Sequence, residues 1–581
     1  MTSDNLWKLK TLPLPACAPG LHAGPPASKL AREADLTPLQ AQLLINRGIS
    51  DKESARLFLR PHLAHMTDPM LMKDMDKGSE IIVNALDGKK KITVYGDYDA
   101  DGLTATALLL NFLSDLDAPV SYYIPNRLKE GYGLNKEAIE KIANRGTDLM
   151  ITVDCGVSNM EEIAFARSLS MNVVVTDHHQ VPADFQANCP VINPHQEGCP
   201  FPFKDLAGVG LAFFLAVAIR YDLRKRGWFK SRPEPDLRAY LDLVALGTVA
   251  DRVPLLGQNR ILVNSGLINM ARTRWPGINA LIKVASIGTS EITSDDLAFR
   301  LAPRLNAPGR MGDPEVGLKM LTVKESHMAR DFAMGANAAN NQRQRVEREI
   351  LENIEGMIKT TEGAKDRRTL IFAGENWHKG VLGIVASRLT DKYHCPSLVF
   401  SIQDGMAVGS GRSIDGFNLY KALGRIGHLF EKFGGHAHAA GFTLKADNLD
   451  ILKSELEAIA CDTFGDETPV PTIEVDAEIA LKDITFETIR QVKALSPFGE
   501  GNPEPLFCTR ALEVLGSSIV GERHLKLRVR QEGMCFEAIG FGLAEKYPLN
   551  GKTINMVFSP EVNRWEGYDR IQLKVIDLEN T

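Results

Sequence analysis

The sequence lacks the features of several large protein classes. Its eight cysteines include no C-x-x-C pair, which argues against a zinc ribbon or a disulfide scaffold and favours a reducing compartment. The longest apolar run, residues 208–219, is shorter than the roughly 20 residues that a bilayer-spanning helix needs. The N-terminal stretch also lacks the apolar segment of a secretory signal. We therefore expect a cytoplasmic protein without a membrane segment.

An excess of positive charge is missing as well. Lysine and arginine total 67 against 73 aspartates and glutamates, which gives a net charge of −6. Proteins that coat nucleic acid through their overall charge are basic, so a nucleic-acid site here would have to be confined to one cleft. At 581 residues the chain is too long for one core, and we expect roughly two to four domains.

The pattern of apolar runs predicts an α/β fold. Between residues 90 and 195, short β-branched runs alternate with helix-length segments, which indicates βαβ units and a parallel sheet. The predicted strands are 91–96, 119–124, 148–154, 171–177 and 189–193. A second α/β unit has strand-like runs at 368–374, 396–401, 406–413 and 438–444.

Two further segments complete the predicted architecture. Residues 325–360 are rich in strong helix formers and predict one long helix between the two α/β domains. The stretch after residue 465 has the short strands and turns of a small β-barrel similar to an OB-fold. The predicted boundaries are an N-terminal arm at 1–65, a first α/β domain at 66–325, a connecting helix at 326–362, a second α/β domain at 363–465 and a barrel at 466–581.

The stretch "GDYDADG" at 96–102 begins like a calcium-binding loop. Such a loop carries a bidentate glutamate at its twelfth position, where this chain has Leu108. It also follows a helix, whereas an apolar strand precedes Asp97. The sequence therefore argues against calcium and leaves a catalytic metal site or a plain acidic turn.

Acidic and imidazole side chains follow three of the predicted strands: Asp97, Asp99, Asp101, Asp154, Asp177, His178 and His179. The carboxyl ends of parallel strands meet at one edge of a sheet, so these groups are expected to converge. Singly, Asp154 or Asp177 could merely cap the next helix. Together they form a cluster that needs cations, and oxygen and imidazole ligands suit Mn²⁺ or Mg²⁺. Two such ions are the usual device for phosphoester hydrolysis.

Several motifs resemble a known superfamily. "VYGDYDADGLTAT", "ITVDCG", "VVVTDHHQ" and "GTVAD", in this order, resemble motifs I to IV of the DHH phosphoesterases. "GSGRS" and "FGGHAHAAG" resemble the companion DHHA1 domain. With "IPNRLKEGYGLN" and "PRLNAPGRMGD", most of the chain is similar to the RecJ family of single-strand DNA exonucleases.

The resemblance implies a set of site residues. The implied metal ligands are Asp97, Asp99, Asp101, Asp154, His178 and Asp251. The implied catalytic residues are Asp99, Asp101, Asp154, His178, His179 and His436. Asp154 is the natural bridge between two metals. Which motif I aspartates touch metal, and whether His179 binds metal or orients a neighbour, stays open.

The substrate side of the site is predicted from further polar residues. In "GSGRS", Ser410 and Arg412 can donate hydrogen bonds to a phosphate, and Gly409 and Gly411 would allow its close approach. A Gly-Ser run can also be an ordinary turn. The resemblance assigns this motif to a terminal 5′ phosphate and His436 to the scissile region. A strand there would place His436 and His438 on one face, and a core location for both is the alternative.

The remaining candidates each have a structural alternative. The candidates for phosphate contacts are Arg127, Arg304, Asn306 and Arg310, where the arginines could instead form intramolecular ion pairs. Trp377 could stack on a base or pack in a core. Lys526, Arg528 and Arg530 lie on one predicted strand face of the barrel and could line a groove or a solvated surface.

The resemblance implies a monomeric 5′ to 3′ exonuclease that degrades single-stranded DNA to 5′ mononucleotides with two Mn²⁺ or Mg²⁺ ions. It also suggests a role in recombination and repair, with a single-strand-binding protein and a helicase as partners. Two alternatives are a DHH enzyme for small substrates (a nano-RNase, a cyclic-dinucleotide phosphodiesterase or a pyrophosphatase) and a non-catalytic strand clamp. The third domain favours a polymeric substrate, and the complete set of acids favours an enzyme.

Overall fold

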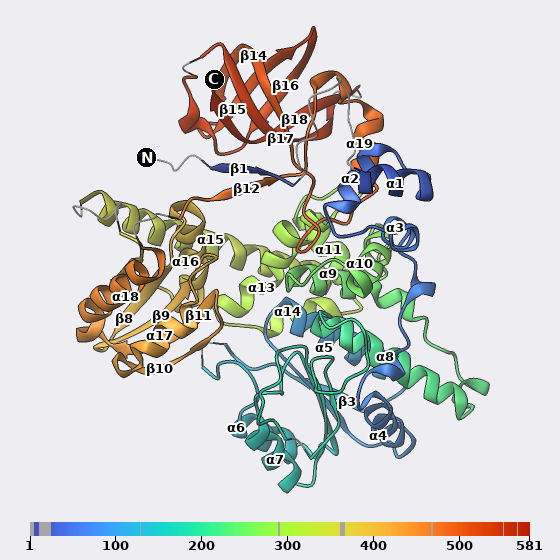
Figure 1. The fold of residues 1–581 in the computed structure, drawn as a ribbon. Helices are drawn as coiled ribbons and strands as arrows, with labels where there is room; N and C mark the ends of the chain where they lie inside the picture. Colours follow the sequence, from blue (N-terminus) through green and yellow to red (C-terminus); the bar gives the residue numbers. More distant parts are fainter. Residues whose placement is uncertain are drawn as a thin grey trace.

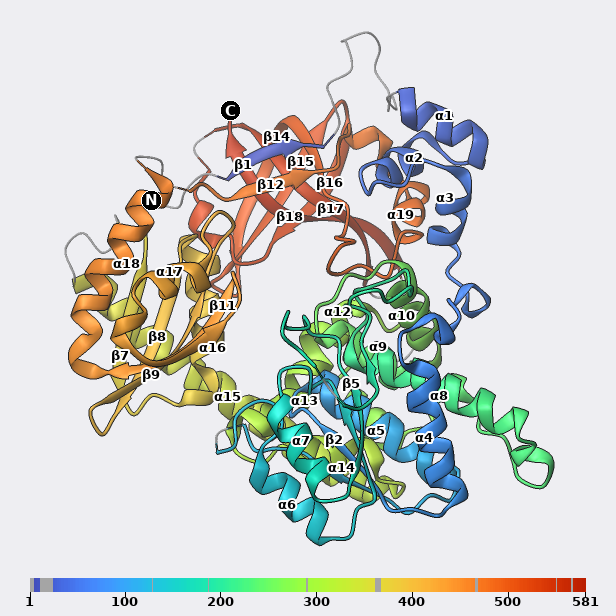
Figure 2. The ribbon, with the colours of Figure 1, turned by 60° about the horizontal axis from the view of Figure 1, so that its bottom comes forward.

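The computed structural model describes residues 5–10, 25–127, 129–186, 188–288, 291–360, 367–465, 469–549, 551–565 and 568–581. Two α/β domains and a barrel make up the chain, and one long helix connects the α/β domains (Figure 1). In the second view of the ribbon, the barrel and the two α/β domains lie around a common centre (Figure 2). In the described ranges, no helix combines the length and the hydropathy that crossing a membrane requires.

The first domain is built on the predicted parallel sheet. Its strands run in the order β3-β2-β4-β5-β6, and all their pairings are parallel. They are β2 (Ile92–Gly96), β3 (Val120–Tyr123), β4 (Leu149–Val153), β5 (Asn172–Thr176) and β6 (Val191–Ile192). All five predicted strands are thereby confirmed.

Helices cover both faces of this sheet, as its continuous apolar strands require. One face packs against α4 (Met75–Asp87), α5 (Ala100–Asp115) and α8 (Gly208–Lys225). The other face packs against α6 (Lys136–Asn144) and α7 (Met160–Ser168). Because β2, β4 and β5 are paired in register, the residues that follow them lie side by side.

A helical layer completes the first domain and carries Asp251 and Arg310 of the site. It consists of α9 (Leu241–Ala250), α10 (Gly257–Met270), α11 (Pro276–Val284), α13 (Ala302–Met311) and α14 (Glu315–Thr322). Asp251 ends α9. Helix α15 (Ser326–Thr360) follows and confirms the predicted connecting helix. Its 35 residues give a length of about 52 Å at 1.5 Å per residue.

The second domain has a mixed sheet in the order β10-β11-β9-β8-β7, parallel only at β7–β8. The strands are β7 (Leu370–Glu375), β8 (Ser397–Gln403), β9 (Met406–Arg412), β10 (Phe430–Gly435) and β11 (Ala439–Lys445). Its helices are α16 (Leu382–Tyr393), α17 (Leu419–Arg425) and α18 (Leu449–Phe464). Helix α17 is short, and β10 follows it. His436 and His438 lie in the turn between β10 and β11, not in a strand.

The C-terminal strands close into a barrel through the pairing of β14 with β17. The strands are β14 (Phe507–Val520), β15 (His524–Gln531), β16 (Met534–Gly540), β17 (Thr553–Trp565) and β18 (Tyr568–Asn580). The barrel is the predicted OB-like module. Two short strands, β12 (Thr472–Val475) and β13 (Ala477–Glu478), and helix α19 (Phe486–Lys493) precede it.

The N-terminal segment packs with this C-terminal module rather than standing apart as an arm. Helices α1 (Pro25–Ala34), α2 (Pro38–Ile45) and α3 (Lys52–Leu59) share an apolar core with the barrel. Strand β1 (Leu6–Leu9) pairs in parallel with β12. Figures 1 and 2 both show β1 beside β12 and the barrel.

Candidate metal centre

The three aspartates of "GDYDADG" differ in their surroundings. Asp97 follows β2 and is buried, and its Oδ1 has no hydrogen-bond partner in the described structure. Asp99 caps α5, where its carboxylate accepts hydrogen bonds from the N–H groups of Asp101 and Gly102 at 3.0 and 3.2 Å. The buried carboxylate of Asp101 accepts the N–H of Gly208 at 2.5 Å. Asp101 therefore caps α8 and joins motif I to that helix.

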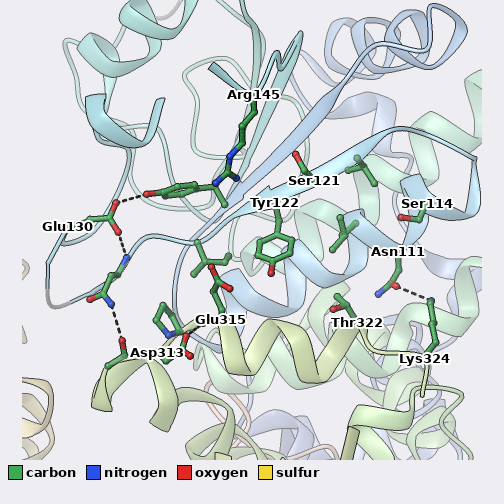
Figure 3. Close-up of a pocket in the computed structure, with 17 residues that line it drawn as sticks. Asn111, Ser114, Ser121, Tyr122, Glu130, Arg145, Asp313, Glu315, Thr322 and Lys324 are labelled. Atoms are coloured by element: carbon green, nitrogen blue, oxygen red, sulfur yellow. Dashed lines mark hydrogen bonds between the residues drawn. The ribbon is translucent and has the colours of Figure 1, made fainter. Parts of the chain in front are cut away.

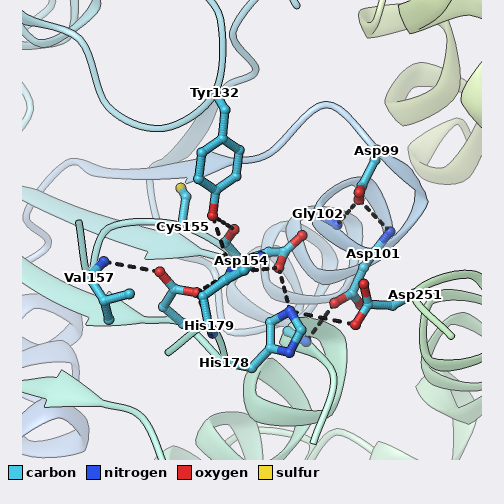
Figure 4. Close-up of polar contacts among 12 residues, drawn as sticks. Asp99, Asp101, Gly102, Tyr132, Asp154, Cys155, Val157, His178, His179 and Asp251 are labelled. Atoms are coloured by element: carbon cyan, nitrogen blue, oxygen red, sulfur yellow. Dashed lines mark hydrogen bonds and ion pairs between the residues drawn. The ribbon is translucent and has the colours of Figure 1, made fainter. Parts of the chain in front are cut away.

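The other three predicted ligands complete the cluster (Figure 4). Asp154 follows β4 in a left-handed conformation, with φ 61°. Its Oδ1 lies 3.1 Å from Nε2 of His178, and the same nitrogen lies 3.5 Å from Oδ2 of Asp251. Strand ends far apart in sequence thus meet at one point.

The candidate ligand atoms form three overlapping groups, each within 4.8 Å: Asp97, Asp99 and Asp154; Asp154, His178 and His179; and Asp101, His178 and Asp251. Asp154 and His178 each belong to two groups. Shared ligands of this kind are what two neighbouring cations require.

Buried polar atoms without partners show that the cluster fits metal ions. In the described part of the chain, four such atoms converge here: Oδ1 of Asp97, Oδ1 of Asp154, Nε2 of His178 and Oδ2 of Asp251. Buried polar atoms are normally satisfied, because leaving them without a hydrogen bond is costly. Three carboxylate oxygens and one imidazole nitrogen are suitable ligands for Mn²⁺ or Mg²⁺.

The electrostatics support the same interpretation. Burial, and then repulsion from neighbouring carboxylates, raises the pKa values of Asp97, Asp101 and Asp154 well above their usual range. Burial also lowers the pKa of His178, which favours the neutral imidazole that binds a metal. Bound cations would reverse the cost of the ionised carboxylates.

His179 is held by Asp177, the first residue of its motif. Its Nδ1 lies 2.8 Å from Oδ1 of buried Asp177, which also accepts the His179 N–H at 3.1 Å. Burial opposes ionisation of both groups, yet their mutual hydrogen bond raises the pKa of His179 to about 9 and lowers that of Asp177. This contact fixes the orientation of the His179 ring.

Tyr132 is a site residue that the sequence reasoning did not select. Its hydroxyl lies 3.1 Å from Nδ1 of His179 and 3.3 Å from the carbonyl oxygen of Asp154. Its ring makes an edge contact with the His179 ring. The only signal for it in the sequence was its place in "IPNRLKEGYGLN".

Arg310, which lies near motif I, is close to arginines of both α/β domains. The guanidinium of Arg127 lies 5.2 Å from the ring centre of Tyr98. Burial, and then the neighbouring arginines Arg127, Arg343 and Arg412, lowers the pKa of Arg310 to about 10. Neighbouring arginines of this kind suit a phosphate group. Arg343, on α15, was not predicted.

The "GSGRS" motif forms β9, and its two types of residue face opposite sides. Ser410 and Arg412 share one face, where Arg412 Nη1 donates to Ser410 Oγ at 3.2 Å. Gly409 and Gly411 face the core: a Cβ would lie 2.5 Å from Phe442 at the first and 3.0 Å from Leu419 at the second. Packing therefore explains these glycines, and the predicted phosphate contact of Gly411 gains no support from its surroundings.

Other predicted substrate residues have varied environments. Arg304 Nε donates to Asn337 Oδ1 on α15 at 2.9 Å, so this arginine has a structural role. Oδ1 of Asn306 is buried without a partner in the described structure and remains a candidate. His436 is exposed, and no described contact joins it to the aspartates. Trp377 packs so closely on Gly374 that a Cβ there would lie 2.2 Å from its ring, which favours the packing interpretation.

On the barrel, two of the three basic side chains of β15 that could line a groove form ion pairs instead. Lys526 lies 3.0 Å from Glu537, and Arg530 lies 2.6 Å from Glu513. Arg530 and Glu513 are directly opposed on neighbouring strands, whereas Glu537 lies opposite Arg528 and diagonally from Lys526. This face is therefore less basic than the sequence alone suggests.

A pocket of about 760 Å³ lies behind the Arg127 loop, at the edge strand β3 (Figure 3). None of the candidate metal ligands lines it. Its wall includes Glu130, whose carboxylate accepts the N–H of Asn126 at 2.6 Å and the hydroxyl of Tyr123 at 2.7 Å. These bonds brace the loop that carries Arg127.

Comparisons with known proteins agree with this arrangement. Three family models match the chain: the DHH family N-terminal domain over residues 91–248, the DHHA1 domain over 367–461 and the RecJ OB domain over 475–577. The DHH match contains all the candidate metal ligands except Asp251. The DHHA1 match contains the "GSGRS" strand. The third contains the barrel.

Individual proteins are similar over nearly the whole chain. The single-stranded-DNA-specific exonuclease RecJ of Bacillus subtilis is 38% identical over 94% of this chain and 69% of its own length. The solved structure of Thermus thermophilus RecJ with Mn²⁺ superposes with a TM-score of 0.82 at 28% identity, covering 99% of this chain and 80% of that one. The same protein with Mg²⁺ gives a TM-score of 0.76 at 26% identity, covering 99% and 78%. The chain belongs to the RecJ family of single-stranded-DNA-specific exonucleases.

Proposed function

We propose that this protein hydrolyses single-stranded DNA from its 5′ end and releases 5′ mononucleotides in a metal-dependent reaction. The observation that carries the proposal is the buried cluster of unsatisfied carboxylate and imidazole atoms. Arg310 lies near Asp99 of this cluster and also near Arg412 of the DHHA1 domain. A metal cluster beside an anion site is suited to a phosphodiester.

Two divalent cations, Mn²⁺ or Mg²⁺, fit the cluster. Asp97, Asp99 and Asp154 would hold one, and His178 and Asp251 would hold the other together with Asp101 and the shared Asp154. When bound, such cations supply a hydroxide nucleophile at neutral pH and stabilise the leaving oxygen. The chain holds His178 neutral and its ligand carboxylates in place for this role.

The substrate contacts follow from the position of the cations. Ser410 and Arg412 share the face of β9 on which we place the terminal 5′ phosphate. Arg127 and Arg310 lie near motif I, where they can bind the scissile phosphate and stabilise its developing charge. A contact of His436 with the scissile region stays part of the proposal on the resemblance of its motif.

We also infer how the enzyme is used. A polymer explains the third module, because a small-substrate phosphoesterase has no need of a barrel with an OB-fold. Recombination and repair in the cytoplasm, as a monomer with a single-strand-binding protein and a helicase as partners, is the setting that the family suggests. Single-stranded DNA is the substrate of this assignment.

The test compares 5′-labelled and 3′-labelled single strands with duplex and RNA in Mn²⁺. The wild type is expected to release labelled mononucleotide first from the 5′ end of single-stranded DNA. Asp154→Ala should abolish release, whereas Asp450→Ala, at an exposed aspartate of α18, should leave it unchanged. Equal release from 3′ ends or from duplex would contradict the proposal, and so would an active Asp154→Ala variant.

A further inference from the structure

A loop of the C-terminal module docks onto the segment that follows Asp251. We call residues 495–503 the docking loop. The carbonyl oxygen of Glu500 accepts the N–H of Leu255 at 2.8 Å, and the carbonyl oxygen of Phe498 accepts the hydroxyl of Ser294 at 2.5 Å. Residues 252–256 connect α9 to α10, so the loop touches the chain within a few residues of a metal-ligand candidate.

Two glycines let the docking loop lie directly on this connection. A Cβ on Gly499 would lie 2.7 Å from a side-chain carbon of Leu255, and a Cβ on Gly501 would lie 3.0 Å from Pro254. Gly501 also has φ +69°. The loop and the connection are therefore in tight contact, and any displacement of one is transmitted to the other.

Arginines hold the docking loop from two sides. Arg260, on α10, is fully buried and donates to the carbonyl oxygens of Ser496 at 2.7 Å and Pro497 at 3.3 Å. It has no acidic partner in the described structure, and burial lowers its pKa to about 9. Arg47 donates to Asn502 Oδ1 at 2.7 Å. Burying a guanidinium is costly, so these bonds mark a closely specified junction.

We infer that the docking loop positions Asp251 for metal binding, so that the C-terminal module forms part of the scaffold of the metal centre. The inference rests on the proposed function, in which Asp251 is a ligand. Oδ2 of Asp251 is buried without a hydrogen-bond partner in the described structure, and it lies 3.5 Å from Nε2 of His178. Mutation of residues that position a metal ligand typically reduces metal affinity or activity by about 10- to 100-fold.

The test uses Gly501→Ala with Gly533→Ala as its matched control. Gly533 lies in the same module with φ +83°, but nothing lies within 4 Å of an added Cβ. Only Gly501→Ala therefore presses on the connection. Mn²⁺ binding is measured directly by the electron paramagnetic resonance signal of free Mn²⁺. The kcat and KM for single-stranded DNA are measured at several Mn²⁺ concentrations.

We expect Gly501→Ala to weaken Mn²⁺ at one of two sites by about tenfold. Its kcat should fall at low Mn²⁺ and recover at high Mn²⁺, with KM for DNA unchanged, while Gly533→Ala behaves like the wild type. If melting shows that Gly501→Ala is unfolded, Ser294→Ala, which removes one hydrogen bond to the loop, should give a smaller shift in the same direction.

The possible results separate the two proposals. Wild-type Mn²⁺ affinity in the folded Gly501→Ala variant, or in Ser294→Ala where the first does not fold, would overturn the docking-loop inference and leave the proposed function standing. An equal loss in Gly533→Ala would also overturn it, because the effect would then belong to the whole module. A wild type that binds no Mn²⁺ and releases no nucleotide would instead overturn the proposed function.

Discussion

Replacing Asp154 by asparagine tests two effects of its charge separately: the destabilisation of the folded protein without metal and the stabilisation by bound metal. Asn has nearly the same shape as Asp and adopts left-handed backbone readily, which suits the φ of 61° at this position. The change removes one charge from a group in which the ligand atoms of Asp97, Asp99 and Asp154 all lie within 4.8 Å. It leaves the rest of the cluster in place.

The expected gain in stability follows from these distances. Two unit charges 4.8 Å apart repel by about 3.5 kcal/mol at an effective dielectric constant of about 20. The pKa of Asp154 is raised in the folded protein, so its proton stabilises the folded state at low pH and this stabilisation is lost as pH rises. At pH 8 without metal, the Asn variant should therefore have a free energy of unfolding about 1–3 kcal/mol higher. For a domain of 150–250 residues this raises the melting temperature by roughly 2–4 °C per kcal/mol.

With added Mn²⁺, the wild type should melt at a higher temperature than Asp154→Asn. A ligand at 100 times its Kd stabilises the folded state by about 2.7 kcal/mol per site, and the wild type should show this gain. Asp154→Asn lacks the shared carboxylate and should gain little. Melting is followed by circular dichroism at pH 8 in EDTA and in Mn²⁺, with Asp450→Asn as the surface control. The reasoning is refuted if Asp154→Asn melts below the wild type in EDTA, or if Mn²⁺ stabilises both proteins equally.

Three further predictions follow. Burial raises the pKa of Asp242 to about 6, so the folded state keeps a proton that the unfolded chain releases. Urea unfolding should show the wild type losing about 2 kcal/mol relative to Asp242→Asn between pH 4 and pH 7, and an unchanged difference would contradict this. Tyr132→Phe should lower kcat about fivefold with little change in KM, because it loses hydrogen bonds to His179 and to the backbone worth about 1 kcal/mol; a change in KM alone would place Tyr132 in substrate binding instead. Arg412→Ala should raise KM about tenfold for strands with a 5′ phosphate but not for strands with a 5′ hydroxyl, whereas Arg304→Ala should lower only the melting temperature; the same KM change in both variants would refute these separate roles.

The sequence by itself determined the parts of this protein that depend on local pattern. A strand of alternating or continuous apolar residues and a helix of strong helix formers can each be recognised within a short window. This is why β2, β4, β5 and α15 lie where the sequence predicts them. The convergence of Asp97, Asp154 and His178 was predictable too, because the order of parallel strands places their carboxyl ends at one edge.

Tertiary structure decided what each of these residues contacts. Asp101 caps α8 across 107 positions of sequence, and Arg304 bonds to Asn337 on α15 instead of facing outward. The glycines of "GSGRS" make room for Phe442 and Leu419. No local pattern encodes such contacts, because each depends on the shape and position of a partner that is remote in sequence.

The largest such effect concerns the two ends of the chain. Residues 25–59 share a core with the barrel, and the docking loop at 495–503 lies against the connection after Asp251. The apolar faces of the helices near the N-terminus must be buried, but the sequence does not show which part of the chain covers them. Packing of the whole chain made the C-terminal module a neighbour of the metal centre, since only the folded arrangement brings these surfaces together.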